Sequence, residues 1–181
     1  KVREQVFAMR NQVQHHLERA RIAARVAVVG TVSDVSPVIA SLARTMPKIH
    51  HDRRLTIETR IVDEVKFNGE RQDFEEMMGN LVDNACKWAN SRVDIEVFRE
   101  PGESPDGRRF FHVLIDDDGP GLPPEMREQI PQRGRKLDES KPGTGLGLSI
   151  VTDLAMLYGG KVIFASAPIG GLRAELVLPA A

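Results

Sequence analysis

Segments with the alternating pattern of β-strands outnumber the helical segments available to connect them, and this imbalance constrains the fold more than any other feature. The strand patterns lie at 55–61, 65–67, 93–98, 110–115, 161–166 and 173–178, and the helical patterns at 36–50, 73–89 and 146–158. A regular parallel sheet needs a crossover helix between successive strands, whereas only a turn at Gly170–Gly171 separates the last two. The pattern therefore predicts an α/β (α+β) two-layer sandwich, a mixed sheet with helices on one face.

A further helical pattern precedes this region. Apolar residues recur at three- and four-residue steps through 2–26, and the pattern ends at Gly30 and Thr31. One amphipathic helix cannot bury its own apolar stripe, so it requires a partner helix. We expect two parts, one long helix within 1–30 and a compact domain over 31–181. Because the chain opens with Lys1, we expect it to be a fragment of a longer protein, with any membrane segment in the missing part.

The composition excludes several classes of protein. With 41% apolar and 28% charged residues, the chain has the balance of a globular protein. The net charge of −1, without a long basic run, argues against a nucleic-acid partner. The single cysteine, Cys86, excludes an internal disulfide and a cysteine-based metal site, and it favours a reducing, cytoplasmic setting. No stretch approaches the roughly 20 apolar residues that span a bilayer.

The helical pattern at 73–89 carries an unusual polar stripe. At helical spacing one side presents Glu76, Asn80, Asn84, Lys87 and Trp88, beside an apolar stripe that can face the sheet. An ordinary solvated face mixes Lys, Glu and Arg and seldom includes two asparagines, which are mediocre helix formers. Amide oxygens and a lysine on one face suit a polyphosphate bound to Mg²⁺, which prefers oxygen ligands. A plain solvated face remains the alternative.

Two glycine-containing motifs follow. The strand pattern at 110–115 leads into three aspartates, 116–118, and then Gly119 and Gly121. A carboxylate there could accept a hydrogen bond from an exocyclic amine such as that of adenine, and glycines allow close approach to a flat base. A calcium-type acidic loop or a plain turn is the alternative.

The second motif is the run 143–147, which leads directly into a helix. Its exposed N–H groups at a helix start attract phosphate. Alone the run is weak evidence, because no strand precedes it and no Gly-Lys-Ser/Thr sequence marks a Walker A loop.

In this order the motifs resemble those of the sensor histidine kinases. The sequence at 80–88 resembles their N box, 117–121 their G1 box, 143–148 their G2 box, and Gly170–Gly171 a last glycine box. The resemblance covers most of the chain and is strongest to kinases of the PhoQ type. These kinases belong to the GHKL ATPase superfamily, together with gyrase, Hsp90 and MutL. It implies the Bergerat (GHKL) ATPase fold, preceded by one long helix.

The resemblance also implies roles, with ATP and Mg²⁺ as the ligands. Asn80 and Lys87 would be the catalytic residues, Asn80 holding Mg²⁺ with Thr144 near the metal. Asn84 and Lys87 would face the phosphates, Trp88 would pack beside adenine, and Asp117 would accept a hydrogen bond from its amino group. A direct role for Glu76 stays open. The remaining nucleotide-lining positions would be Gly119, Gly121, Gly143, Thr144, Gly145, Leu146 and Gly147.

The segment between the glycine motifs departs from the family pattern. Its polarity predicts a mobile cover, yet 130–134 reads Ile-Pro-Gln-Arg-Gly where the family has a phenylalanine. Without that aromatic anchor the closed position of the cover is left open. Arg133, Lys136 and Lys141 supply positive charge that could reach phosphate oxygens, with solvated loop charges as the alternative.

The phosphate-accepting histidine of the family has no match here. His15 and His16 precede Leu17-Glu18-Arg19-Ala20, and the proline that lies a few positions beyond the acceptor in the family does not follow. The two histidines also lie on the helix that the resemblance makes the second arm of a dimerising hairpin. We therefore expect a cytoplasmic part of an inner-membrane histidine kinase that presents Mg-ATP to a histidine outside this chain. Its partners would be the other kinase subunit, through the hairpin, and the receiver domain of a response regulator.

Two other functions remain possible on the residues alone. A conformational ATPase of the gyrase kind needs a glutamate base, which Glu76 could supply, but the N-terminal helix and the Lys87-Trp88 pair argue against it. A degenerate, non-enzymatic docking module would be expected to have lost Asn80, Asp117 or Gly145.

Overall fold

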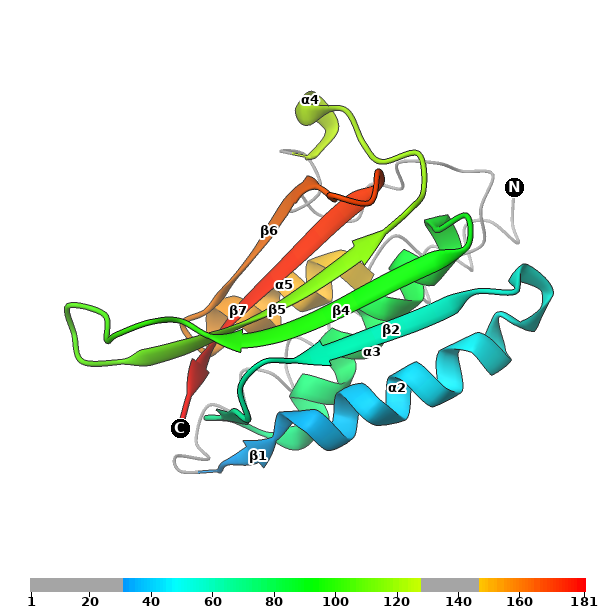
Figure 1. Cartoon of the computed structure of the whole chain (residues 1–181). Coiled ribbons are helices and arrows are strands. Elements are labelled where there is room, and N and C mark those ends of the chain that lie inside the picture. Colours follow the sequence, from blue (N-terminus) through cyan, green and yellow to red (C-terminus); the bar gives the residue numbers. More distant parts are fainter. Residues whose placement is uncertain (1–30, 128–146) are drawn as a thin grey trace, which may run out of the picture.

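The sheet runs the length of the domain and carries its helices on one side (Figure 1). The computed structural model describes residues 31–127 and 147–181. The strands are β1 (Ser33–Asp34), β2 (Thr56–Ile61), β3 (Lys66–Phe67), β4 (Arg92–Arg99), β5 (Arg109–Asp117), β6 (Lys161–Ser166) and β7 (Leu172–Ala180). The helices are α2 (Val35–Ile49), α3 (Arg71–Trp88), α4 (Pro124–Arg127) and α5 (Gly147–Leu157), with the 3-10 turn η1 (His51–Arg53).

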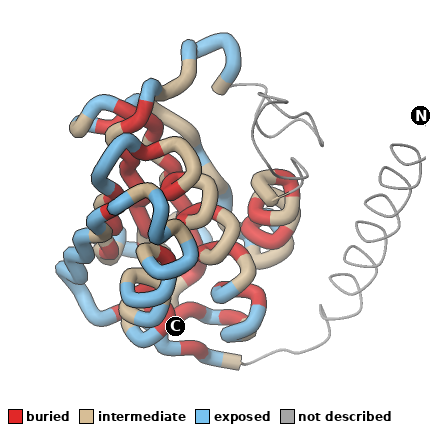
Figure 2. The backbone as a smooth tube through the Cα atoms, turned by 90° about the vertical axis from the view of Figure 1, so that its right-hand side faces the viewer, coloured by how far each residue is buried: buried red, intermediate tan, exposed pale blue. Residues whose placement is uncertain are grey.

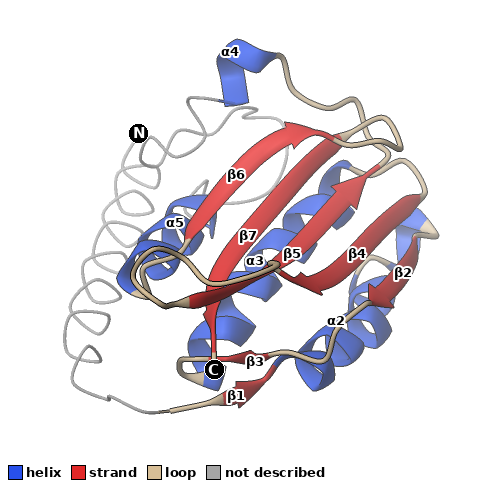
Figure 3. Ribbon diagram, turned by 60° about the vertical axis from the view of Figure 1, so that its left-hand side comes forward, coloured by secondary structure: helices blue, strands red, loops and turns tan. Residues whose placement is uncertain are grey.

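The sheet is mixed, as the sequence predicts. Its strand order is β1-β3-β7-β5-β4-β2, and β6 also pairs with β7. β2 and β4 are parallel, with α3 in the connection between them, and the other pairings are antiparallel. The hairpin expected at Gly170–Gly171 is the antiparallel pair of β6 and β7. Figure 3 shows α2, α3 and α5 behind the sheet, which confirms the two-layer sandwich.

The core lies between the sheet and the helices, where buried positions cluster in Figure 2. Phe67, Phe74 and Phe111 are fully buried, with ring centroids 5.7–6.4 Å apart. Tyr158, just beyond α5, packs its ring 4.8 Å from Phe67 and donates its hydroxyl to Asp73 Oδ2 at 2.6 Å. Burial, and then the contact with Asp73, raises the pKa of Tyr158, so the phenol stays protonated and able to donate. This bond joins α5 to the first turn of α3.

Cross-strand pairs occupy the sheet face opposite the helices. Arg173 of β7 holds Asp116 of β5 through two bonds of 2.7 and 2.6 Å, and the Asp116 contact raises the pKa of the guanidinium. His112 Nδ1 lies 2.7 Å from Glu175 Oε1, and its ring stacks on Phe98 at 4.9 Å. These pairs shield parts of a sheet face that no described helix covers.

Most predicted elements agree with the structure to within two residues at their ends. The sequence missed β1, η1 and α4 because segments of two to four residues are too short to show a period. The helix predicted at 146–158 begins at Gly147 in the described part of the chain. The helix expected in 2–26 and most of the cover expected in 119–145 lie outside the described residues. Within 31–127 and 147–181, no helix has both the length and the apolar character to cross a membrane.

Candidate nucleotide-binding site

The two stripes predicted on α3 are separate in the structure. The apolar stripe is buried against the sheet and the neighbouring helices, whereas the five polar positions are half-buried. The buried residues are Phe74, Met77, Met78, Leu81, Val82 and Ala85, and the half-buried ones are Glu76, Asn80, Asn84, Lys87 and Trp88. Asn80 Nδ2 donates to the Glu76 carbonyl at 2.9 Å, which leaves its Oδ1 directed away from that bond. A stripe at the edge of the core, partly open to solvent, can contact a ligand.

The three consecutive aspartates have three different environments. Asp116 points to the open sheet face and pairs with Arg173, as described above. Asp117 lies opposite Val93 in the β4–β5 register and points to the helix side, because successive strand residues face opposite ways. Asp118 follows the strand and binds the turn after α3. Of the three aspartates, only Asp117 therefore faces the side of the sheet on which the polar stripe of α3 lies.

Asp117 is a buried carboxylate with fixed orientation. It is 2% exposed, and its Oδ1 accepts hydrogen bonds from the N–H groups of Gly119, at 2.9 Å, and Leu172, at 3.3 Å. Burial raises the pKa of Asp117, and these two N–H bonds oppose the rise. Both bonds end on Oδ1, so Oδ2 is the oxygen that remains for a ligand donor.

Glycines permit the tight packing around this carboxylate. A Cβ on Gly171 would collide with Asp117 Oδ1 and the Asp117 carbonyl, and it would lie 2.6 Å from the Gly119 nitrogen. A Cβ on Gly119 would collide with the Trp88 carbonyl. Gly121 has φ +67°, a conformation that side chains disfavour. The acidic turn, the glycine turn before β7 and the end of α3 thus meet at one point.

The start of α5 contacts the polar stripe. A Cβ on Gly147 would lie 2.6 Å from Asn80 Oδ1, closer than side chains pack. Gly147 is the last glycine of the 143–147 motif, and Asn80 is the first asparagine of the helix motif. Sequence-distant motifs therefore touch on one side of the sheet, with Asp117 and Gly119 at the C-terminal end of α3.

Residues that sequence analysis missed hold the end of α3 in place. Arg53 of η1 donates to the carbonyls of Lys87 and, at 2.6 Å, Ala89, which neutralises the unpaired carbonyls at the helix end. Asp118 Oδ1 accepts from the N–H groups of Asn90, Ser91 and Arg92 at 2.7–3.1 Å. No local pattern identifies either residue, because their partners are 26 to 36 positions away.

We expect Asp118→Asn to lower the free energy of unfolding by about 1 kcal/mol at pH 7. Partial burial opposes ionisation, but hydrogen bonds from Ser91 and the backbone lower the pKa of Asp118 from 3.8 to about 2. A lowered folded-state pKa stabilises the fold above pH 3.8, and this contribution is lost as the pH falls toward 2. Urea denaturation at pH 7, 4 and 2.5 should show the two proteins converging at low pH. A difference that does not depend on pH would contradict this account.

Lys87 lies in an ion pair on its own helix. Its Nζ is 2.5 Å from Asp83 Oδ2, and the Asp83 Oδ1 is 2.9 Å from His50 Nε2. Cys86 lies between Asp83 and Lys87 in the sequence, and its thiol is buried. Burial, and to a smaller extent the negative charge of Asp83, raises the pKa of this thiol to about 11. The thiol is therefore unreactive near neutral pH.

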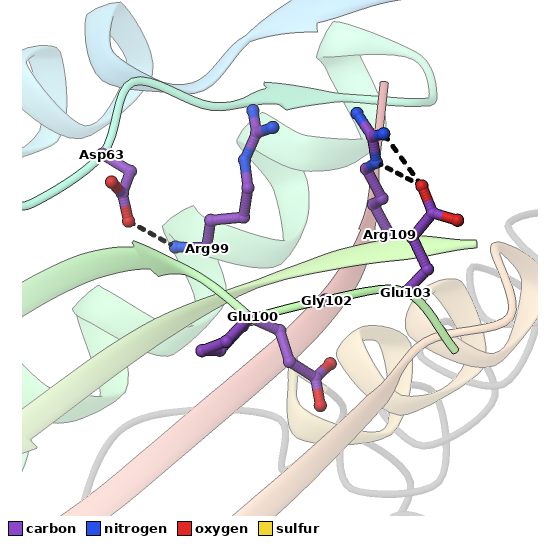
Figure 4. Close-up of a pocket in the computed structure, with 7 residues that line it drawn as sticks. Asp63, Arg99, Glu100, Gly102, Glu103 and Arg109 are labelled. Carbon is purple, nitrogen blue, oxygen red and sulfur yellow. Dashed lines mark hydrogen bonds and ion pairs between the residues drawn. The ribbon is translucent and has the colours of Figure 1, made fainter. Parts of the chain in front are cut away.

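A separate cleft lies at the other end of the sheet (Figure 4). Asp63, Arg99, Glu103 and Arg109 are among the residues that line its volume of about 440 Å³. Arg109 binds Glu103 at 2.8 Å, and Asp63 accepts from the Arg99 backbone N–H at 2.9 Å. This cleft has neither the asparagine stripe nor Asp117, so it is not the site that the motifs predict.

Several predicted site residues lie outside the described part of the chain. They are Arg133, Lys136, Lys141, Gly143, Thr144, Gly145 and Leu146, together with His15 and His16. Among residues 31–127 and 147–181, no group of three or more His, Cys, Asp or Glu side chains could hold a metal ion. Asn80 stays a predicted Mg²⁺ ligand.

Comparisons with known proteins identify the family of the chain. The sequence profile of the family described as histidine kinase-, DNA gyrase B-, and HSP90-like ATPase matches residues 69–181. The chain is 35% identical over 98% of its length to the sensor protein kinase CarS of Pseudomonas aeruginosa and 32% identical over 96% to the sensor protein PhoQ of Escherichia coli. It covers 38% and 34% of those proteins, and so spans only about a third of their length.

Solved structures show the same likeness. The mycobacterial sensor histidine kinase MprB superposes with a TM-score of 0.66 at 27% identity, over 84% of this chain and 98% of that one. The ATP-binding domain of PrrB from Mycobacterium tuberculosis, at 22% identity and a TM-score of 0.65, shares the fold over 83% of this chain and 97% of its own. The chain therefore belongs to the histidine kinase-, DNA gyrase B- and HSP90-like ATPase family, as an ATP-binding catalytic domain of the kind that sensor histidine kinases carry.

Proposed function

We propose that this domain binds Mg-ATP with adenine at Asp117 and the phosphates along Asn80, Asn84 and Lys87, and presents the γ-phosphate to a histidine outside the chain. The observation that carries the proposal is the contact between motifs, with Gly147 against Asn80 and Gly119 against the Trp88 carbonyl. These contacts bring a base-recognition carboxylate, an amide stripe and a helix start to one side of the sheet.

The residues fit a purine nucleotide. Asp117 has Oδ1 held by two N–H groups, so a donor such as the adenine amino group would meet Oδ2 at low cost in side-chain entropy. Gly119 and Gly171 let the backbone pack closely against Oδ1 of this carboxylate, where a Cβ on Gly119 would lie 2.8 Å away and one on Gly171 closer still. A keto group, as in guanine, would present a second acceptor to Asp117, so the site should prefer adenine.

The residues also fit the magnesium that accompanies ATP. Asn80 Oδ1 is a neutral oxygen beside the α5 N-terminus, and Mg²⁺ in phosphate sites takes few protein ligands and shares phosphate oxygens. When bound, Mg²⁺ would neutralise negative charge on the phosphates during transfer.

The chain's own contribution to phosphoryl transfer is positioning and charge. Asp117 fixes the base, and Lys87 and the backbone N–H groups at the start of α5 supply positive charge along the phosphates. Thr144, near the metal, and Arg133, Lys136 and Lys141 of the predicted cover would complete the phosphate site. A histidine nucleophile would enter from a dimerising hairpin to which residues 1–30 would contribute one arm.

The relatives support a place in two-component signalling. CarS and PhoQ are sensor kinases, and this chain matches about a third of each. We propose that the whole protein is an inner-membrane histidine kinase whose dimer phosphorylates itself and then the receiver domain of a response regulator. The domain would lie on the cytoplasmic side, where ATP is available.

Calorimetric titration tests this function directly. We expect ATP and ADP to bind in the micromolar range with Mg²⁺ and more weakly without it, and GTP to bind at least tenfold more weakly. Incubation with radiolabelled ATP should leave no acid-labile label on His15 or His16. Equal affinity for ATP and GTP, or no binding at all, would refute the proposal, and label on either histidine would refute its separation of acceptor and catalytic domain.

A further inference from the structure

Lys87 has a partner that competes with any phosphate for its charge. The ammonium lies 2.5 Å from Asp83 Oδ2, and the two side chains are 32% and 34% exposed. Asp83 is four residues before Lys87, so the two lie one turn apart on the same side of α3, in the favourable order of acid before base. Asn80 and Asn84 lie on the same stripe as Lys87. A modest rotation of the lysine side chain can therefore exchange the carboxylate for a ligand on the stripe.

Asp83 is itself fixed from the other side. His50, at the C-terminal end of α2, places Nε2 2.9 Å from Asp83 Oδ1, and the His50 side chain is only 13% exposed. Each oxygen of the carboxylate thus has one partner, His50 on Oδ1 and Lys87 on Oδ2. Next to them, Arg53 binds the Lys87 carbonyl. The backbone of Lys87 is therefore held independently of its side chain, which allows the ammonium to move without disturbing the helix end.

We propose that Asp83 is a positioning residue for the phosphate site, an internal counter-ion that holds the Lys87 ammonium when no nucleotide is bound and releases it to the phosphates of ATP. The inference rests on the proposed function, in which Lys87 faces those phosphates. Release costs the domain an ion pair, so Asp83 weakens ATP binding. Asp83 also keeps the Lys87 side chain extended beside the polar stripe, and His50 keeps the Asp83 carboxylate turned toward Lys87.

This arrangement predicts a tightening rather than a loss when the acid is removed. Partly exposed ion pairs contribute little, so Asp83→Asn should bind ATP about threefold more tightly than the unmodified chain. Asparagine preserves the size of the side chain and can still accept from His50 through Oδ1. Adenosine has no phosphate, so its affinity should not change.

The decisive test is a double-mutant cycle on ATP affinity, with Asp83→Asn, Lys87→Met and the double variant titrated with ATP and with adenosine. If Asp83 acts through Lys87, the threefold gain vanishes in the Lys87→Met background. A gain that persists there would mean a general repulsion of phosphate, and an unchanged or weaker ATP affinity in Asp83→Asn would mean a structural role. Either result overturns the inference. Should Asp83→Asn fail to fold, Asp83→Ser carries the same comparison.

Failure of the proposed function would look different. The unmodified chain would then bind no ATP, or would bind it as weakly as adenosine, before any variant is compared. ATP binding that Lys87→Met leaves unchanged would remove the lysine from the phosphate site while leaving base recognition by Asp117 in place.

Discussion

Asp117→Asn is expected to weaken ATP binding about a hundredfold while leaving the fold intact. The asparagine oxygen can keep the hydrogen bonds from the Gly119 and Leu172 N–H groups, which both end on Oδ1. Its amide nitrogen then replaces Oδ2, so a donor faces the donor of the adenine amino group. Because the site is buried, neither donor can be satisfied by water without reopening it. Calorimetry measures the affinity, and urea denaturation checks the stability.

Asp116→Asn is the matched control, because it makes the same chemical change one residue earlier. Asp116 lies on the opposite sheet face and pairs with Arg173, so ATP affinity should stay within twofold even if stability falls. Equal losses of affinity in the two variants would show that general acidity of the turn matters rather than recognition by Asp117. Unchanged affinity in Asp117→Asn would remove this residue from the site.

Gly171→Ala is expected to lower the free energy of unfolding by about 3 kcal/mol. The added methyl group would collide with the Asp117 carboxylate and with backbone atoms of Asp117 and Gly119. The carboxylate cannot move easily because it is buried, and the backbone of Asp117 is held because its carbonyl accepts a hydrogen bond from the Gly171 N–H at 3.0 Å. Displacement of Asp117 should also abolish measurable ATP binding. Urea denaturation and calorimetry of the same variant report both effects.

Gly79→Ala provides the opposite case within the same chain. Gly79 lies inside α3, and a Cβ there would meet nothing within 4 Å. Alanine should therefore stabilise the domain by about 0.5–1 kcal/mol by reducing the freedom of the unfolded chain. A similar loss of stability in both variants would contradict the packing account of Gly171.

The sequence alone predicts a large part of this structure. The periods of the strands and helices identify the mixed sheet and its helical layer, because each pattern follows from which face must be buried. The two stripes of α3 also follow from spacing, since residues such as Asn80, Asn84 and Lys87 share a side of any helix. The order of the motifs, with their resemblance to the sensor kinases, indicates the family that the comparisons confirm.

The tertiary structure decided which partners these residues have. Strand alternation separates Asp116 from Asp117, but only the pairing with β7 brings Gly171 and Leu172 to the Asp117 carboxylate. The contacts of Arg53 with the end of α3 and of His50 with Asp83 join segments 33 to 36 residues apart. Local sequence patterns indicate which face of a helix or strand a residue occupies. They do not indicate which distant segment contacts that face, because this contact depends on how the whole chain packs.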